Sequence, residues 1–292
     1  MPDAFTAYHP IVNFVYFAAV LVFTMFCMNP ICITISVGCA LLYAFCLQGF
    51  KLVKFVVWFA FPTVVFVCII NPLFNHRGQT VLAYLPWGNP LTMESLLFGF
   101  AAAILLLSVI FWFSCCNRVM TTDKFLYLFG RIVPSLSLIL SMALRFIPQF
   151  KEQFKQVRSA QKSLGCDLTE GSLRQRFLNA ANIFSIMITW SLENAVQTAD
   201  SMKNRGYGLP GRTAYSVYQF ERRDGLLLCV LACLIVYVSV GLFGNGFDFY
   251  YFPVVKDIYF NSFMIAYFML CATPLILNGR EVIRWKYLQS KI

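Results

Sequence analysis

Long apolar runs separated by short polar breaks dominate the chain. No Asp, Glu, Lys or Arg occurs in residues 4–50, which is enough for two membrane-spanning helices of about 20 residues each. Asn29 and Pro30 divide this stretch, because Asn caps a helix and Pro fits its first turn. Further apolar runs follow at residues 55–75, 95–117, 225–247 and 258–279, with Asn71-Pro72 and Asn89-Pro90 bracketing a loop after the third. The pattern predicts about six transmembrane helices.

Composition supports a membrane protein over a soluble domain with a large core. Hydrophobic residues make up 59% of the chain and charged residues 12%, against roughly 25% charged residues in soluble proteins. Helices are the default spanning element because they pair their own backbone polar groups within lipid. The predicted fold class is therefore an all-α, polytopic helical membrane protein.

A basic segment interrupts the apolar pattern. Residues 118–223 hold 15 of the 23 Lys and Arg residues. Their apolar runs, 132–144 and 177–192, are too short for a span, so they form either the core of a cytoplasmic domain or helices on the membrane surface. We predict three regions: 1–117 with helices 1–4, 118–224 as a cytoplasmic helical domain, and 225–292 with helices 5–6 and a cytoplasmic tail.

The cations also set the predicted orientation. If the basic segment is cytoplasmic, 21 Lys and Arg residues lie inside and only Arg77 and Lys256 lie outside. Cytoplasmic loops of membrane proteins are enriched in cations, so we predict a multi-pass plasma-membrane protein with both termini in the cytoplasm. The basic segment would also attract anionic lipid headgroups.

Two amphipathic helices are predicted within the basic segment. We expect helices to restart near Pro134 and Pro148, and the first amphipathic helix to end at Gly165, a left-handed cap. The second runs from about Ser172 to a similar end at Gly206. The two ends align with a shift of 41 residues, as E-x3-Q-x5-K-x2-G, and each places a lysine, Lys162 or Lys203, where a cation complements the helix dipole.

Catalytic and metal-binding chemistry has little support in the sequence. There is no G-x4-G-K-[ST] loop for nucleotide, and His9 and His76 are interpreted as lone loop histidines without ligand partners. The cysteines lack metal-ligand spacing and are interpreted as apolar filler. No carboxylate lies mid-span, Glu94 being at the entry of the fourth span, which argues against a proton- or sodium-coupled carrier. Nucleic-acid binding is not expected either, because the positive-inside rule explains the basic charge.

Four segments resemble a known family. They are NPLFNHRGQTVL (71–82), ALRFIPQF (143–150), AQKSLG (160–165) and SLENAVQTADSMKNRGYG (191–208). They are similar to the transmembrane T component of energy-coupling factor transporters, bacterial and archaeal ABC-type importers of vitamins and metal ions. The resemblance covers the chain from the third span to about Asp224.

The resemblance implies that 118–224 is a coupling domain whose two helix ends dock on two ABC-type ATPase subunits. The implied docking residues are Ala160, Gln161, Lys162, Ser163, Leu164 and Gly165 at the first end, and Lys203, Asn204, Arg205, Gly206, Tyr207 and Gly208 at the second. Both motifs lack the family's usual alanine, and Leu164 stands where the family has arginine. Either Lys162 or Arg158 supplies that charge, or the two ATPase grooves differ.

The apolar faces of the same helices are expected to form a platform for a membrane substrate-binding subunit. The platform residues are Leu138, Met142, Phe146, Pro148, Phe184 and Met187. The chain itself would bind no cofactor and catalyse nothing, since ATP and Mg would sit on the partner ATPases. The alternative function is a stand-alone channel or secondary carrier with a cytoplasmic regulatory domain. A membrane-embedded enzyme would need a catalytic cluster, for which the sequence offers no candidate.

Overall fold

The computed structural model describes residues 4–75, 78–84, 90–166, 172–207, 218–244, 246–247, 249–252 and 259–290. The chain divides into two compact units. Unit 1 consists of Met1–Phe125 and Tyr218–Ile292, and unit 2 of Leu126–Val217. Unit 2 lies within the region 118–224 that the sequence singles out.

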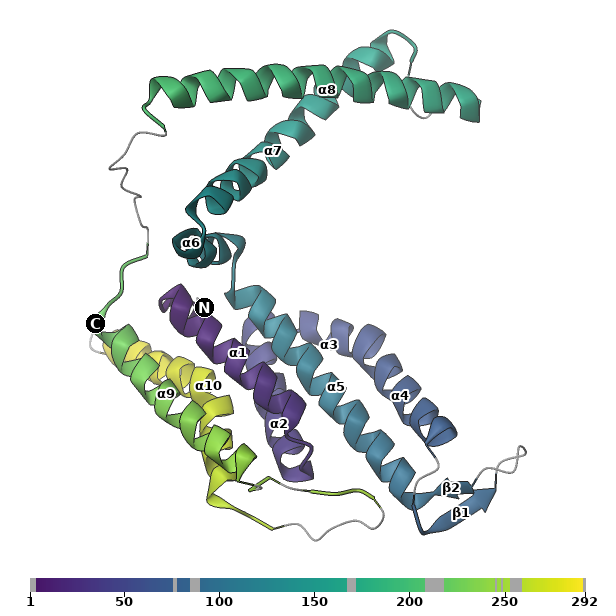
Figure 1. The fold of residues 1–292 in the computed structure, drawn as a ribbon, viewed down its shortest axis with the longest axis vertical. Coiled ribbons are helices and arrows are strands. Elements are labelled where there is room, and N and C mark those ends of the chain that lie inside the picture. The colour runs from purple at the N-terminus through teal and green to yellow at the C-terminus, as the bar shows by residue number, and fades with distance from the viewer. Residues whose placement is uncertain are drawn as a thin grey trace. The chain divides into compact units, whose positions relative to one another are not determined.

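Unit 1 is a helical bundle (Figure 1). Its elements are η1 (Phe5–Ala7), α1 (Pro10–Phe26), α2 (Pro30–Gln48), α3 (Lys51–Phe55), the π-helical turn η2 (Val56–Ala60), α4 (Phe61–Phe74), β1 (Val81–Tyr84), β2 (Pro90–Thr92), α5 (Met93–Val119), α9 (Arg222–Phe243) and α10 (Ser262–Gln289). The helix α6 (Thr122–Ile132) begins in this unit and continues into unit 2.

Within the described residues, five helical stretches are long and apolar enough to cross a membrane: Pro30–Gln48, Leu52–Phe74, Met93–Val119, Arg222–Phe243 and Ser262–Gln289. The apolar helix α1 is shorter, with 17 residues, or about 26 Å at 1.5 Å per residue. The protein is therefore an all-α polytopic membrane protein. The predicted count of six spans corresponds to these five stretches and the shorter α1.

Two Asn-Pro pairs that look alike in sequence behave differently. Asn29 caps α2, its side chain accepting a hydrogen bond from the backbone N–H of Ile31 at 3.0 Å, and Pro30 is the first residue of the helix. The expected loop start at Asn71-Pro72 is wrong, because α4 continues to Phe74 with Pro72 inside it. Packing explains this, since α4 lies against α5 at Gly99, where an added Cβ would be 3.2 Å from Asn71 Cβ.

A short antiparallel hairpin follows α4, which the hydropathy pattern did not predict. Strand β1 pairs with β2, with Val81 opposite Thr92 and Tyr84 opposite Pro90. Thr92 caps α5, its hydroxyl accepting from the backbone N–H of Ser95 at 3.4 Å. Glu94 is buried in the first turn of α5 and accepts a hydrogen bond from the Thr80 backbone N–H at 3.3 Å. The hairpin and the start of α5 are thus tied together.

A buried polar network joins four helices of unit 1. Ser36 of α2 lies within hydrogen-bonding distance of Thr24 (3.1 Å) and Ser108 (2.7 Å), and it accepts from Trp112 Nε1 at 2.9 Å. Thr24 also lies 2.9 Å from the hydroxyl of Tyr267 in α10. All of these side chains are buried. Small polar side chains that hydrogen-bond across helices are a recurring means of fixing helix packing in membranes.

We expect Ser36→Val to destabilise unit 1, because Thr24, Ser108 and Trp112 all lose their shared partner. The expected cost is about 1–3 kcal/mol for leaving buried polar groups without a hydrogen bond. Thermal unfolding of the purified chain in detergent measures it. Thr34→Val is the matched control in the same helix, since Thr34 is exposed and bonds only locally, to the Ile31 carbonyl. Equal effects of the two substitutions would contradict the network's role.

Unit 2 contains the remainder of α6 and two long helices, α7 (Pro134–Ser163) and α8 (Leu173–Asn204), which cross each other (Figure 1). At the crossing Val157, Ile183 and Met187 form a small buried cluster against Trp190. The Phe150 and Trp190 rings meet edge to face at 5.3 Å. Among the described residues of this unit the buried apolar core is confined to this crossing.

The predicted helix starts are partly correct. A helix begins at Pro134, and Ser172 caps α8 by accepting a hydrogen bond from the Gln175 backbone N–H at 3.4 Å. The expected restart at Pro148 is wrong, because Pro148 lies inside the continuous helix α7. A proline removes one backbone hydrogen bond from a helix, and the apolar face running through Phe146 and Phe150 continues across that gap, with the two rings 6.4 Å apart.

Candidate functional site

Both long helices of unit 2 end in the same backbone motif. Gly165 has φ 74° and Gly206 has φ 76°, the left-handed conformation that glycine adopts without strain. At the first end the N–H of Gly165 donates to the Lys162 carbonyl and the N–H of Cys166 to the Gln161 carbonyl, both at 3.0 Å. This pair of bonds defines a Schellman motif, which satisfies the last carbonyls of a helix.

The end of α8 repeats this arrangement. The N–H of Gly206 donates to the Lys203 carbonyl at 3.0 Å, and the N–H of Tyr207 donates to the Met202 carbonyl at 3.1 Å. Leu164 and Arg205, which precede the two glycines, have nearly equal backbone angles, φ −89° and ψ 5° against φ −85° and ψ 5°. The 41-residue repeat in the sequence therefore corresponds to two equivalent backbone positions that carry different side chains.

The side chains at both ends are open to solvent. Ala160, Lys162, Ser163, Lys203, Asn204 and Arg205 are exposed, Leu164 is 73% exposed and Tyr207 40%, while Gln161 and Gly206 are half-buried. Gly208 lies outside the described residues. Lys162 and Lys203 each lie in the last turn of their helix, where a cation is stabilised by the helix dipole.

The two ends lie on different arms of the helix crossing. Figure 1 shows α7 and α8 crossing, with the C-terminal end of each helix on a separate arm. Helix α8 has 32 residues, or about 48 Å at 1.5 Å per residue, and its crossing residues Ile183 and Met187 lie far from Arg205 along the helix. A partner at one end therefore leaves the other end free for a second partner.

The predicted platform residues, which lie on α7 and α8, differ in their exposure. On α7, Leu138, Met142 and Phe146 are half-buried and Pro148 is exposed. On α8, Phe184 is 68% exposed, whereas Met187 is buried in the helix crossing. Phe184 and Met187 also line a groove of about 640 Å³, together with Phe150, Lys151, Phe154, Lys155, Ile188 and Ser191.

The structure corrects the interpretation of His9 as a lone loop histidine. His9 is buried and caps α1, its Nδ1 accepting a hydrogen bond from the Ile11 backbone N–H at 3.3 Å. His76 lies outside the described residues. Within the described ranges, no three His, Cys, Asp or Glu residues gather into a group able to hold a metal ion.

A second group of polar residues, all within unit 1, was not predicted from the sequence. Lys124 and Asp224 are both buried, close to where the backbone leaves unit 1 and returns to it. A signal for Asp224 was present, because Glu221 and Asp224 precede an apolar run with capping-box spacing. In the structure the two side chains form that box at the start of α9.

A family model and several known proteins match this chain, and they agree on its family. The family model described as "Cobalt transport protein" (CbiQ) matches residues 7–215. The energy-coupling factor transporter transmembrane protein EcfT of Staphylococcus aureus is 26% identical over 245 residues, covering 78% of this chain and 88% of that protein. EcfT 1 of Listeria monocytogenes is 27% identical over 66% of this chain and 73% of that protein.

A shorter alignment has higher identity. The EcfT protein of Lactobacillus helveticus is 34% identical over 113 residues, which span 38% of this chain and 41% of that protein. The family match covers most of unit 1 up to Phe125 and nearly all of unit 2, so it includes both helix ends described above. The chain therefore belongs to the CbiQ family of cobalt transport proteins and is a transmembrane T component of the energy-coupling factor kind.

Proposed function

We propose that this chain is the coupling subunit of an energy-coupling factor importer for a vitamin or metal ion. In this function it transmits ATP-driven motion from two ABC-type ATPase subunits to a membrane substrate-binding subunit. The chain carries no catalytic residue and binds no cofactor directly, since ATP and Mg are bound and used on the ATPases. Unit 2 faces the cytoplasm, with both chain termini on the same side.

The observation that carries this proposal is the pair of equivalent Schellman ends on separate arms of unit 2. Each end presents exposed side chains at a rigid backbone position. Two equivalent ends suit two related partners, as in a pseudo-symmetric ATPase pair. Each helix is also continuous from its end to the helix crossing, so a displacement of the end is passed along the helix to the crossing.

The chemistry of the two ends differs, so the two ATPase grooves differ as well. Arg205 carries a planar guanidinium that pairs bidentately with carboxylates, which suits an acidic groove. Leu164 is 73% exposed in the chain alone and suits an apolar groove. The nearby cations Arg158 and Lys162 lie at the rim of that contact.

The apolar surface of unit 2 is the proposed contact for the membrane substrate-binding subunit. Several apolar side chains of α7 and α8 are exposed, among them Ile139 at 63%, Phe177 at 75% and Phe184 at 68%. Contiguous exposed apolar area is typical of interaction sites. The small buried cluster at the helix crossing leaves most of this area available to a partner.

Reconstitution tests the proposal. The chain is purified after co-expression with a pair of ATPase subunits and a substrate-binding subunit, and uptake into proteoliposomes is measured with and without ATP. We expect the ATPases to co-purify and uptake to require all subunits and ATP. Failure of the ATPases to co-purify, or ATP-independent uptake by the chain alone, would overturn the proposal, and the latter would favour a channel or secondary carrier.

A further inference from the structure

The backbone leaves unit 1 after Phe125, early in α6, and returns to it at Tyr218, shortly before α9. We call the residues of unit 1 next to these two points the outgoing passage (121–125) and the returning passage (218–224). Both passages contact the same short segment of unit 1. The short segment is residues 4–13, comprising η1 and the start of α1. We call it the N-terminal anchor.

The anchor is itself fixed in the bundle core. Phe5 is fully buried and packs edge to face on Tyr16 at 5.0 Å and on Phe17 at 6.1 Å. The backbone N–H of Ala4 donates to Oδ1 of Asn278 in α10 at 2.9 Å. The anchor therefore moves with unit 1 and provides a fixed reference for whatever is attached to it.

Lys124 attaches the outgoing passage to the anchor. Its side chain is buried, and Nζ donates to the Thr6 carbonyl at 2.7 Å. The side-chain amide of Asn13 is oriented so that both its oxygen and its nitrogen are hydrogen-bonded. In this orientation the Lys124 ammonium also donates to the Asn13 oxygen at 2.9 Å, and the Asn13 amide nitrogen donates to the Phe5 carbonyl at 3.0 Å. A buried ammonium is stable only when its donors are paired, so these acceptors hold the first turn of α6 in place.

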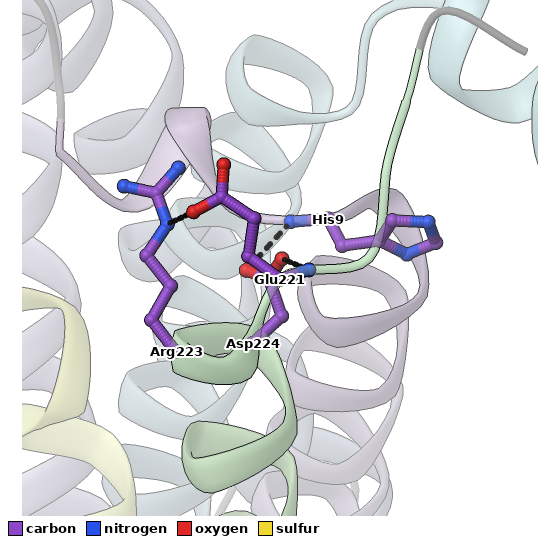
Figure 2. Close-up of polar contacts among 4 residues, drawn as sticks. All are labelled: His9, Glu221, Arg223 and Asp224. Atoms are coloured by element: carbon purple, nitrogen blue, oxygen red, sulfur yellow. Dashed lines mark hydrogen bonds and ion pairs between the residues drawn. The ribbon is translucent and has the colours of Figure 1, made fainter.

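Asp224 attaches the returning passage to the same anchor, as Figure 2 shows. Its Oδ1 accepts from the His9 backbone N–H at 3.3 Å, and its Oδ2 accepts from the Glu221 backbone N–H at 3.0 Å. The His9 ring packs edge to face on Phe220 at 5.3 Å. One buried carboxylate thus caps α9 and holds α9 to the start of α1.

Further contacts join the two passages to each other and to the anchor. The guanidinium of Arg223 lies over the Tyr8 ring at 5.5 Å and its Nε pairs with Glu221 at 2.9 Å. Burial raises the pKa of the Tyr218 phenol, and the Asp123 carboxylate raises this pKa further, while a side-chain hydrogen bond with Thr121 lowers it. The returning passage is therefore close to the residues that begin α6.

From this geometry we infer that Lys124 and Asp224 are positioning residues for coupling, which hold both passages to the N-terminal anchor so that movement of unit 2 is transmitted to the membrane bundle. The inference rests on the proposed function. If either attachment is lost, the passage it held moves without moving the anchor. Part of the movement of unit 2 then only distorts that passage and does not reach the membrane bundle. ATP hydrolysis then continues while transport per ATP falls.

The test uses Lys124→Met and Asp224→Leu in the full chain, which keep side-chain size approximately and remove the polar atoms that make each attachment. Hydrogen exchange of the purified chain is measured for residues 120–132 and 218–228. We expect exchange there to accelerate by about tenfold, the factor for one lost charge-assisted hydrogen bond. Lys286→Met and Glu281→Leu, at exposed positions of α10, are the matched controls and should leave exchange unchanged.

The second measurement uses the complete complex in proteoliposomes. We expect uptake per ATP hydrolysed to fall by about fivefold or more, the low end of typical coupling between sites, with ATPase recruitment and hydrolysis retained. Unchanged exchange overturns the inference. Faster exchange with unchanged uptake per ATP also overturns it. The same holds if exchange is faster but hydrolysis and uptake fall in equal proportion, because that result indicates a merely structural role.

The two proposals fail in distinguishable ways. If the wild-type chain recruits no ATPase, the proposed function is wrong, and the coupling role of Lys124 and Asp224 falls with it. The exchange measurement, made on the chain alone, still decides whether the anchor holds both passages. If the wild-type complex is active and the variants behave like the controls, only the anchor inference is overturned.

Discussion

Arg205→Glu is expected to abolish stable recruitment of one ATPase subunit. In the proposed complex Arg205 pairs with a carboxylate in a desolvated groove, and removing one partner of such a pair costs about 3–5 kcal/mol. That corresponds to a dissociation constant weaker by about 100-fold or more, at 1.4 kcal/mol per tenfold. The glutamate adds repulsion from the acidic groove, so the loss is at least this large.

Native mass spectrometry of the co-purified complex measures the effect as a missing ATPase subunit. Arg284→Glu is the matched control, because it reverses an exposed arginine on α10, which belongs to unit 1 and to neither of the two helix ends. Leu164→Ala is expected to weaken assembly less, by about 2 kcal/mol for the lost burial of one apolar side chain. Intact transport by Arg205→Glu would contradict the docking role of Arg205.

The backbone of the two helix ends of unit 2 was predictable from sequence because it depends on local rules. Glycine tolerates the left-handed conformation that a Schellman cap requires, so Gly165 and Gly206 mark helix ends whatever surrounds them. Asn29-Pro30 was predictable for the same reason. The apolar runs likewise predicted the spans, since crossing a bilayer depends on length and composition.

Features that depend on tertiary packing were missed or misjudged. Pro72 and Pro148 have the local signature of a break, yet each lies inside a helix, because the neighbouring turns and packing outweigh one lost hydrogen bond. His9 was assigned to a loop because no partner lies near it in sequence. Its contacts come from Phe220 and Asp224, more than 200 residues away along the chain, which sequence spacing does not reveal.

The platform prediction shows an intermediate case. The sequence analysis assigned both Phe184 and Met187 to the platform, but an apolar run does not indicate which of its residues a crossing helix covers. The crossing buries Met187 against Val157 and leaves Phe184 open. An apolar run therefore predicts that a helix has apolar side chains to bury, while the division between buried and exposed side chains depends on where the helices cross.

Leu164→Arg distinguishes two unlike ATPase grooves from two alike ones. The backbone angles at Leu164 and Arg205 are nearly equal, so arginine fits at position 164 without local strain. Any change in binding then arises in the groove. If that groove is apolar, as we propose, it receives a charge without a partner. The cost is several kcal/mol, since burying an unpaired charge is strongly unfavourable, and the ATPase at that end should be lost.

Leu164→Met is the control, because swaps of similar hydrophobic volume cost less than about 1.5 kcal/mol, and it should retain both ATPases. The measurement is the number of ATPase subunits per chain in the purified complex, with ATP hydrolysis as a second readout. If Leu164→Arg instead tightens binding, the groove at that end is acidic and the two grooves are alike. Leucine at this position would then make a weaker contact with an acidic groove, and the two ends would differ in affinity for their ATPase subunits and not in the chemistry of the groove.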